Sequence, residues 1–191
     1  MRSLVYYVAT SIDGFIAGPD GSFDAFANDP ETLAVLFARY PETCPAHVRP
    51  HLGITAQPAR FDAVVMGANT HRPALDARLT SAYPHLQQYV VTHGELPQDP
   101  TVTRVDGDPV SFVADLECQE GRDIWLCGGG DLAGQLIDEI DELQVKVNPV
   151  LLGEGIPLAR LAPAPRTFDL VDSQVLPAGV VLTTYRRSSR G

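Results

Sequence analysis

Three consecutive glycines, Gly128 to Gly130, follow a short apolar stretch and precede a segment with helical spacing. Glycine lets backbone N–H groups approach a phosphate, and the positive end of a helix dipole favours negative charge there. Asp131 suits the first helical turn or its cap, and Leu132 and Leu136 follow at helical spacing. The pattern therefore predicts an anion site where a strand meets a helix. The alternative is a tight turn that needs glycine only for its dihedral angles.

Two further groups of residues have types that could do chemistry. Lys146 is the only lysine, and alternation along 143–148 places it with Gln144 and Asn148 on one face of a strand. That polar face lines a substrate cleft, is solvated, or meets another subunit. His47 and His51 are four apart, but prolines interrupt their segment. No metal site is therefore expected, and the five histidines are interpreted as surface residues.

The size and composition indicate one α/β domain. Of the 191 residues, 45% are hydrophobic, and we expect a single domain at 1–187 with a frayed tail at 188–191. The formal net charge of −10 argues against partners such as nucleic acid or an anionic membrane. Three cysteines without metal-ligand spacing suit a reduced, cytoplasmic protein. No apolar run approaches the ~20 residues of a membrane span, and the N-terminus has no signal-peptide pattern.

Short apolar segments alternate with amphipathic ones along most of the chain. Strands are expected at 4–10, 61–66, 86–92, 102–105, 124–127, 143–152, 168–176 and 180–186. Helices are expected at 29–40, from after Gly67 to 79, at 109–119 and at 131–140, whereas 11–24 and the proline-rich 41–58 are expected to be irregular. Alternating strands and helices predict a mostly parallel sheet covered on both faces, and the last two strands predict an antiparallel hairpin.

Five motifs occur at these strands and strand ends in the order of one known family. They are Val8-Ala9-Thr10-Ser11-Ile12-Asp13-Gly14-Phe15-Ile16-Ala17, Val65-Met66-Gly67-Ala68-Asn69-Thr70, Val90-Val91-Thr92, Cys127-Gly128-Gly129-Gly130, and Asp141-Glu142-Leu143 with Pro149-Val150-Leu151-Leu152-Gly153-Glu154-Gly155. Over nearly its whole length the chain thus resembles the dihydrofolate reductase-like fold, especially the branch containing riboflavin-biosynthesis reductase domains. The resemblance implies an α/β fold with a mixed, mostly parallel central sheet, helices on both faces and a C-terminal antiparallel hairpin.

The resemblance also implies a coenzyme site across the C-terminal ends of the parallel strands, for NADPH and, as a second coenzyme, NADH. By motif position, the pyrophosphate would meet Gly128, Gly129, Gly130, Asp131 and Leu132; the adenosine side, Gly67, Ala68, Asn69 and Thr70; the adenine ribose, Thr92 and His93; and the nicotinamide, Ala9, Ile16 and Ala17. The family further implies a cis peptide bond between Gly128 and Gly129.

Candidates for the chemistry follow from the same alignment of motifs. Asp13, beside the expected nicotinamide, is the first candidate for proton donor, and Asp24 is the second; the alternative for both is a turn-forming or capping role. Dihydrofolate reductases carry a carboxylate on the first helix, and here Glu31 lies near that place, with Leu33 beside it, although the motif is not matched. Glu31, Leu33 and Lys146 are the candidates for substrate binding.

The sequence thus predicts an NAD(P)H-dependent reductase of a small carbonyl or heteroaromatic substrate, the latter resembling a pterin, a pyrimidine or a flavin precursor. The alternative is a non-catalytic protein that keeps the nucleotide or pterin-like pocket, because the helix carboxylate motif is missing. An ordinary Rossmann dehydrogenase is disfavoured, because no G-x-G-x-x-G follows the first strand.

Coenzyme preference and assembly are two further expectations from the family. NADPH-specific members usually place arginine or lysine after the glycine of M-G-x-x-T, where this chain has Ala68. We therefore expect NADPH to remain usable with only a small advantage over NADH, unless Arg72, Arg104 or His93 compensates. The riboflavin-type branch commonly pairs through its late strands, which implies a homodimer.

Overall fold

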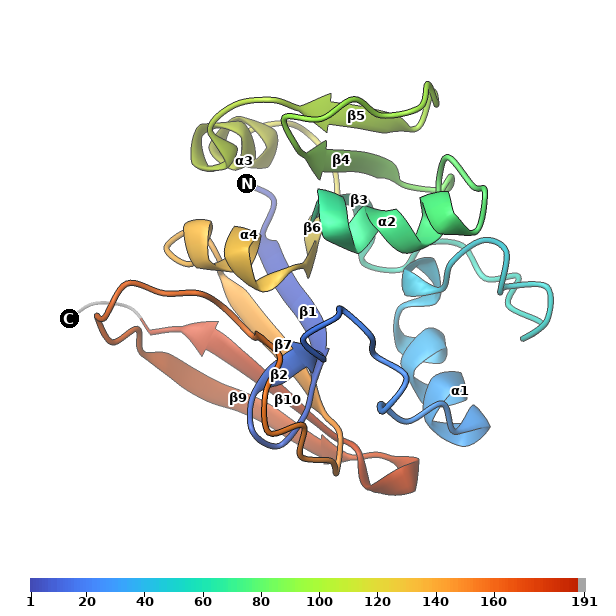
Figure 1. Cartoon of the computed structure of the whole chain (residues 1–191), viewed down its shortest axis with the longest axis vertical. Coiled ribbons are helices and arrows are strands. Elements are labelled where there is room, and N and C mark those ends of the chain that lie inside the picture. Colours follow the sequence, from blue (N-terminus) through green and yellow to red (C-terminus); the bar gives the residue numbers. More distant parts are fainter. Residues whose placement is uncertain (189–191) are drawn as a thin grey trace.

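An eight-stranded sheet forms the centre of the computed structural model, which describes residues 1–188. The strands lie in the order β5-β4-β3-β6-β1-β7-β10-β9. Neighbours from β5 to β7 are parallel, and β7, β10 and β9 are antiparallel (Figure 1). Their bounds are β1 Leu4–Thr10, β3 Phe61–Gly67, β4 Gln87–Val91, β5 Val102–Val105, β6 Asp123–Gly128, β7 Glu142–Val147, β9 Phe168–Val175 and β10 Val181–Arg187. The predicted mixed sheet and C-terminal hairpin are confirmed.

A second, two-stranded sheet pairs β2, Phe15–Ala17, with β8, Ile156–Pro157. The predicted strand at 143–152 was wrong in its second half, because β7 ends at Val147. The Asn148 side-chain amide donates to the carbonyl oxygens of Thr10 and Lys146, which turns the chain out of the ladder. The released segment returns beside the loop after β1 as β8, an element too short to leave a periodic pattern.

Within residues 1–188, four α-helices and two short 3-10 helices connect the strands. Their bounds are α1 Pro30–Arg39, α2 Ala68–Asp76, α3 Pro109–Glu117, α4 Gly130–Gln135, η1 Pro41–Thr43 and η2 Pro177–Gly179. Asp29 and Asp108 cap α1 and α3 by accepting backbone N–H groups of the first turn, as such residues commonly do. The helix predicted at 131–140 ends early, since residues 136–139 form turns that let Leu136 and Ile140 both reach the core.

The sheet is covered on both faces, as expected. One core cluster joins β1 and β6 to α3 and α4, and the other joins β1, β3, β6 and β10 to α1. Figure 1 shows α3 and α4 on one side of the sheet and α1 and α2 on the other. Because the parallel strands point the same way, the C-terminal ends of β1, β3 and β6 meet at one edge, where α2 and α4 begin.

Ser188 is the last residue that the structure describes. The Ser188 N–H donates to the carbonyl oxygen of Thr167, so the first residue of the predicted frayed tail is hydrogen-bonded. The rest of that prediction, 189–191, lies outside the described residues. Within 1–188, no helix has the length and apolar character needed to cross a bilayer.

Candidate functional site

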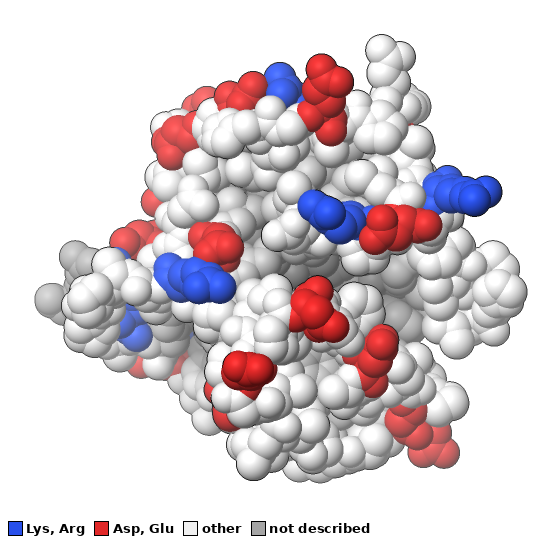
Figure 2. All heavy atoms as spheres, in the orientation of Figure 1, with Lys and Arg blue, Asp and Glu red and all other residues white. Residues whose placement is uncertain are grey.

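A cleft of about 460 Å³ opens at the C-terminal ends of β1, β3 and β6. Figure 2 shows this face of the molecule hollowed between α2 and α4. Its volume lies within the roughly 300–1,000 Å³ typical of small-molecule sites. The predicted coenzyme residues that line it are Ala9, Ile16, Ala17, Gly67, Ala68, Asn69, Thr70, Gly129, Gly130, Asp131 and Leu132. The structure thus brings together most of that set, drawn from four separate segments of the chain.

The glycine turn at 128–130 forms one wall of the cleft. The Gly128–Gly129 peptide is cis, as predicted, and Gly128 has a φ of 126°, which favours glycine. A Cβ on Gly130 would overlap the backbone oxygen of Pro157, so only glycine fits under the β8 segment. A Cβ on Gly129 would instead point between the Thr70 hydroxyl, at 3.6 Å, and Ile16. The turn therefore leaves open a narrow space that any side chain at Gly129 would partly fill.

The first turn of α2 forms the facing wall. Gly67 is the N-cap residue of this nine-residue helix, and no side chain caps the helix. The backbone N–H groups of Ala68, Asn69 and Thr70 therefore have no capping side chain as acceptor. These groups, together with the Thr70 hydroxyl, are suited to oxygen atoms of an anionic ligand. α4 spans only six residues, and its Asp131 forms an ion pair with Arg160 at 2.8 Å.

The other half of the cleft is apolar and was not predicted from the sequence. Phe23 and Phe26, from the loop between β2 and α1, line it together with Cys127. The loop is tied down where the Ala27 N–H donates to the Asn148 side chain at 3.0 Å. Phe23 is 56% exposed. The sequence signal that could have pointed to this half of the site is the pair of phenylalanines, Phe23 and Phe26, within a loop rich in Gly, Asp and Ser.

Asp13 lies outside the cleft lining and acts as a turn residue. Its carboxylate accepts the N–H groups of Leu152 and Gly153 at 3.1 and 2.7 Å, which joins the loop after β1 to the segment after β7. The Ser11 hydroxyl, followed by these N–H groups, lowers the pKa of Asp13 to about 2. Because the group is ionised at neutral pH, it has no proton to donate. The arrangement favours the turn-forming alternative over the proton donor.

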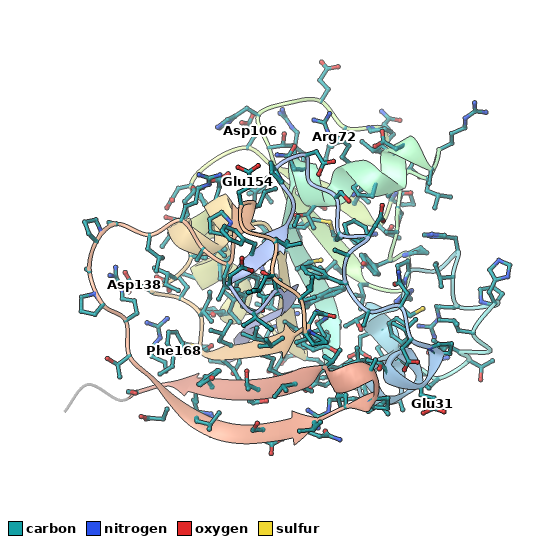
Figure 3. All side chains as sticks on the ribbon, turned by 60° about the horizontal axis from the view of Figure 1, so that its bottom comes forward. Glu31, Arg72, Asp106, Asp138, Glu154 and Phe168 are labelled. Carbon is teal, nitrogen blue, oxygen red and sulfur yellow. The ribbon has the colours of Figure 1, made fainter. Side chains whose placement is uncertain are left out.

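The other candidate acids and the first-helix position also lie outside the lining. Asp24 is exposed in the loop between the two phenylalanines. Glu31 is exposed in the first turn of α1, and Leu33, two residues later, is half-buried. Figure 3 places Glu31 at the opposite side of the view from Arg72, Asp106 and Glu154. The structure therefore does not bring Glu31 or Leu33 to the cleft lining.

The residues predicted to flank the adenine ribose lie just beyond the cleft. Thr92 and His93 follow the lining residue Val91, and the Thr92 hydroxyl accepts the Gly94 N–H at 3.0 Å. His93 is exposed and contacts Asp106 at 2.8 Å. Within residues 1–188, no group of three or more His, Cys, Asp or Glu side chains is placed to hold a metal ion.

Lys146 lies behind the cleft rather than in its open lining. Its ammonium nitrogen sits 3.7 Å from the centroid of the Tyr7 ring. Burial lowers the pKa of Lys146 to about 8, an effect that the neighbouring Cys127 partly opposes. A lysine held in this way changes its charge close to neutral pH.

Comparison with known sequences gives one family. Residues 2–182 match the profile of the RibD C-terminal domain. The chain is 31% identical to YwjB, an uncharacterized protein of Bacillus subtilis strain 168, over 162 residues that cover 82% of each chain. It is 26% identical to YyaP, a second uncharacterized protein of the same strain, with 96% of this chain and 94% of YyaP covered.

Solved structures show the same fold. A proposed riboflavin biosynthesis protein of Shewanella sp. PV-4 superposes with a TM-score of 0.71 at 27% identity, covering 99% of this chain and all of that one. A diaminohydroxyphosphoribosylaminopyrimidine deaminase/5-amino-6-(5-phosphoribosylamino)uracil reductase of Thermotoga maritima has a TM-score of 0.65 at 17% identity. The match covers 98% of this chain and 57% of that longer protein. A pyrimidine reductase-like protein of Corynebacterium diphtheriae gives 0.61 at 13% identity, covering 99% and 93% of the two chains.

Proposed function

Since the chain belongs to the RibD C-terminal domain family, with a dihydrofolate reductase-like fold, we propose that it is an NAD(P)H-dependent reductase of a small pyrimidine-like heteroaromatic compound. The observation that supports this most is the cleft itself. One half is built from backbone N–H groups and glycines, and the other half is apolar and aromatic. Such a division suits a phosphate-bearing coenzyme beside a flat organic ring.

The coenzyme half fits a dinucleotide by two features. The space that a Cβ on Gly129 would occupy, between Thr70 and Ile16, leaves the backbone accessible to a pyrophosphate. The uncapped first turn of α2 presents N–H groups from the opposite side. A bound NADPH or NADH would supply the hydride. The protein's own contribution is orientation, because hydride transfer depends on the position of the reacting carbon atoms.

The substrate half contributes shape and exclusion of water. Phe23 and Phe26 offer aromatic faces on which a flat heterocycle can stack. Ala9, assigned to the nicotinamide, is small and lies in the cleft wall at the end of β1, so the nicotinamide and the substrate ring can both come close to the strand. A pyrimidine ring is planar and polar at its edges. We therefore propose pyrimidine-like compounds as the substrates that bind in the aromatic half of the cleft.

The test is binding followed by turnover. Thermal shift and quenching of NADPH fluorescence measure coenzyme binding, and absorbance of NADPH measures its oxidation with 5-amino-6-(5-phosphoribosylamino)uracil, dihydrofolate or flavin as acceptor. We expect NADPH to raise the melting temperature, because a ligand that binds only the native state stabilises it by mass action. We expect oxidation with the pyrimidine acceptor. Absence of any shift with millimolar NADPH or NADH would sink the proposal.

A non-catalytic binding protein is the second candidate. It is favoured by one observation: Asp131 is the only acidic residue in the cleft lining drawn from residues 1–188, and it is paired with Arg160. This alternative expects a thermal shift with NADPH and no oxidation with any acceptor. The same two measurements therefore separate the candidates.

We also propose a cytoplasmic location and a homodimer. The location rests on three free cysteines, Cys44, Cys118 and Cys127, a composition typical of reducing compartments. The dimer rests on the exposed edge strand β9, whose outward side chains include Leu170, Val171 and Val175.

A further inference from the structure

Lys146, the only lysine of the chain, lies next to the cleft on the face of the sheet that α1 covers. It is in β7, directly opposite Ala9 of β1 in the parallel register. Residues paired in register point to the same face of a sheet. Since Ala9 lines the cleft, the Lys146 side chain begins one strand spacing, about 4.8 Å, from the cleft wall.

The ammonium of Lys146 has an aromatic partner and no counterion. It rests on the Tyr7 ring, which Tyr40 contacts edge-on. Among residues 1–188, no carboxylate oxygen lies within 4.0 Å of it. Glu142, on the same face of β7, is occupied by Arg60 at 2.7 Å and by Gln144 at 2.6 Å. Lys146 is half-buried, and a charge withdrawn from water is usually paired, so this ammonium is available to another partner.

The groups around Lys146 are neutral at pH 7. Burial raises the pKa of the Cys127 thiol on β6 to about 12, and burial also raises the pKa of the Tyr7 phenol on β1. β10 contributes Leu182 opposite Lys146, and the α1 side contributes Tyr40 behind Tyr7. Desolvation is therefore the main influence on the ammonium, and it brings the pKa to about 8. At that value the group is mostly protonated at neutral pH and gives up its proton readily.

We propose that Lys146 is the proton donor of the reductase, reaching past Ala9 and Cys127 to the nitrogen or oxygen of the C=N or C=O bond that is reduced in the bound substrate. This proposal rests on the proposed function. The four-carbon stem of lysine is flexible, and a cation resting on an aromatic ring is free to exchange that contact for a more basic atom. Cys127 and Tyr7 neighbour the ammonium, and the two cleft-lining residues on this side, Ala9 and Cys127, are both small.

The step balances with the coenzyme as reductant. The hydride adds to the carbon of a C=N or C=O bond, and the π electron pair moves to the nitrogen or oxygen. That atom takes a proton as one Nζ–H bond of Lys146 breaks. Lys146 is left as a neutral amine and regains its proton from solvent, which returns the site to its starting state.

The first test asks whether the amine is reachable from the cleft in the folded protein. Trace labelling with acetic anhydride between pH 6 and 11, followed by peptide mass spectrometry, reports the reactivity of Lys146, with the N-terminal amine as internal control. We expect labelling of the native protein with a midpoint near pH 8. Labelling that occurs only after unfolding, or a midpoint at the ordinary value of about 10.4, overturns the proposal.

The second test uses Lys146→Gln and Lys146→Arg. Arginine keeps the charge but holds its proton at neutral pH, so it separates proton donation from charge alone. With NADPH and 5-amino-6-(5-phosphoribosylamino)uracil, we expect both variants to lose about 10²–10⁴-fold in kcat. We also expect both to bind NADPH within twofold of the wild type. The wild-type rate should fall as pH rises above 8, since the donor is then deprotonated, and the variants should lack that limb.

The outcomes distinguish this proposal from the proposed function. If the wild type neither binds nor oxidises NADPH, the proposed function fails and the proton donor fails with it. If the wild type turns over and either variant keeps kcat within threefold, only the role of Lys146 is overturned. A variant that binds NADPH normally has kept its fold, so loss of kcat in it supports proton donation.

Discussion

Arg104 forms an ion pair within the described residues, 1–188, and Arg72 forms none there. Arg104 pairs with Asp106 at 3.0 Å, and Asp106 also contacts His93. The His93 hydrogen bond, followed by the Arg104 charge, lowers the pKa of Asp106. Arg72 is exposed on α2, where Figure 3 shows it, and it forms no ion pair within residues 1–188. Of the three candidates for a compensating cation, Arg72 is therefore free to meet a 2′-phosphate at the lowest cost.

Coenzyme preference should follow from this difference. We expect NADPH to exceed NADH in kcat/KM by less than a hundredfold, because Ala68 offers no charge. Arg72→Ala should bring the ratio toward one, and Ala68→Arg should raise it by about one to two decades. Steady-state kinetics with both coenzymes measure the ratio, with Arg104→Ala as the matched control. A preference above a hundredfold that survives Arg72→Ala would assign the contact to Arg104 instead.

Glu117 at the end of α3 is a buried acid with an unusual pKa. Its side chain is 7% exposed, and its Oε1 has no hydrogen-bond partner among residues 1–188. Burial, followed by the charges of Asp141 and Glu139, raises the pKa of Glu117 from 4.5 to about 7. Between these two values the folded protein binds more protons than the unfolded chain. Stability contributed by protonated Glu117 is therefore lost as pH rises through that window.

Replacing this acid should flatten the pH dependence of stability. We expect Glu117→Gln to melt higher than the wild type at pH 8 and close to it at pH 4, since the amide mimics the protonated acid. Melting temperatures measured by calorimetry from pH 4 to 8 test this, with exposed Glu120→Gln as control. Parallel curves for wild type and Glu117→Gln would contradict it.

At the scale of elements, the cleft depends on how closely the β8 segment crosses the start of α4. The Arg160 N–H donates to the Gly130 carbonyl at 2.9 Å, and the Tyr6 hydroxyl donates to the Leu158 carbonyl at 2.8 Å. These bonds hold residues 156–160 against the glycine turn. Gly129, one position earlier, faces the open cleft instead. Gly130 therefore allows the β8 segment to pack closely, whereas Gly129 leaves space for a ligand in the cleft.

Alanine at these two positions should have different effects. In Gly129→Ala the new Cβ meets only ordinary contacts, at 3.6 Å from Thr70 and 3.8 Å from Ile16, so the fold should persist while NADPH binding weakens tenfold or more. In Gly130→Ala the Cβ overlaps the Pro157 backbone, so the melting temperature itself should fall. Thermal melts and NADPH titrations of both variants provide the comparison. Equal melting temperatures and equal affinities in the two variants would refute the assignment.

For the whole molecule, β9 is the edge of the sheet with the most exposed apolar surface. All but one of its residues are exposed, including Leu170, Val171 and Val175 at 59%, 51% and 76%. An uncovered edge strand with apolar side chains invites pairing with another strand. A second copy of the chain, related by a two-fold axis, is the simplest partner.

The homodimer prediction can be tested by mass and by one charged substitution. We expect a dimeric mass by light scattering at micromolar concentration, and a monomeric mass for Val171→Glu, because a charge in a paired apolar edge is costly. Leu161→Glu, at an exposed apolar position in a loop, is the control and should remain dimeric. A monomeric wild type would count directly against the assembly.

Local sequence patterns were sufficient for the order of the elements, and the resemblance to a known family pointed to most of the residues that line one half of the cleft. Apolar runs ended by glycine predicted β3 and β6 to within two residues. Thr70 and Gly129 were assigned to a common site by their positions in the family's motifs, and both line the cleft at the C-terminal ends of parallel strands. The physical reason is that each of these features is encoded within a few neighbouring residues.

Only the tertiary structure decided the contacts between distant segments. The Gly153 N–H donates to the Asp13 carboxylate, 140 residues away in the chain. This contact favours a turn-forming role for Asp13 over the predicted role as proton donor. The register of β1 and β7 placed Lys146 opposite Ala9, and burial lowers its pKa to about 8. Phe26 reached the cleft because its loop is held by Asn148. Pairing register and desolvation depend on segments far apart in the chain, and no local pattern contains them.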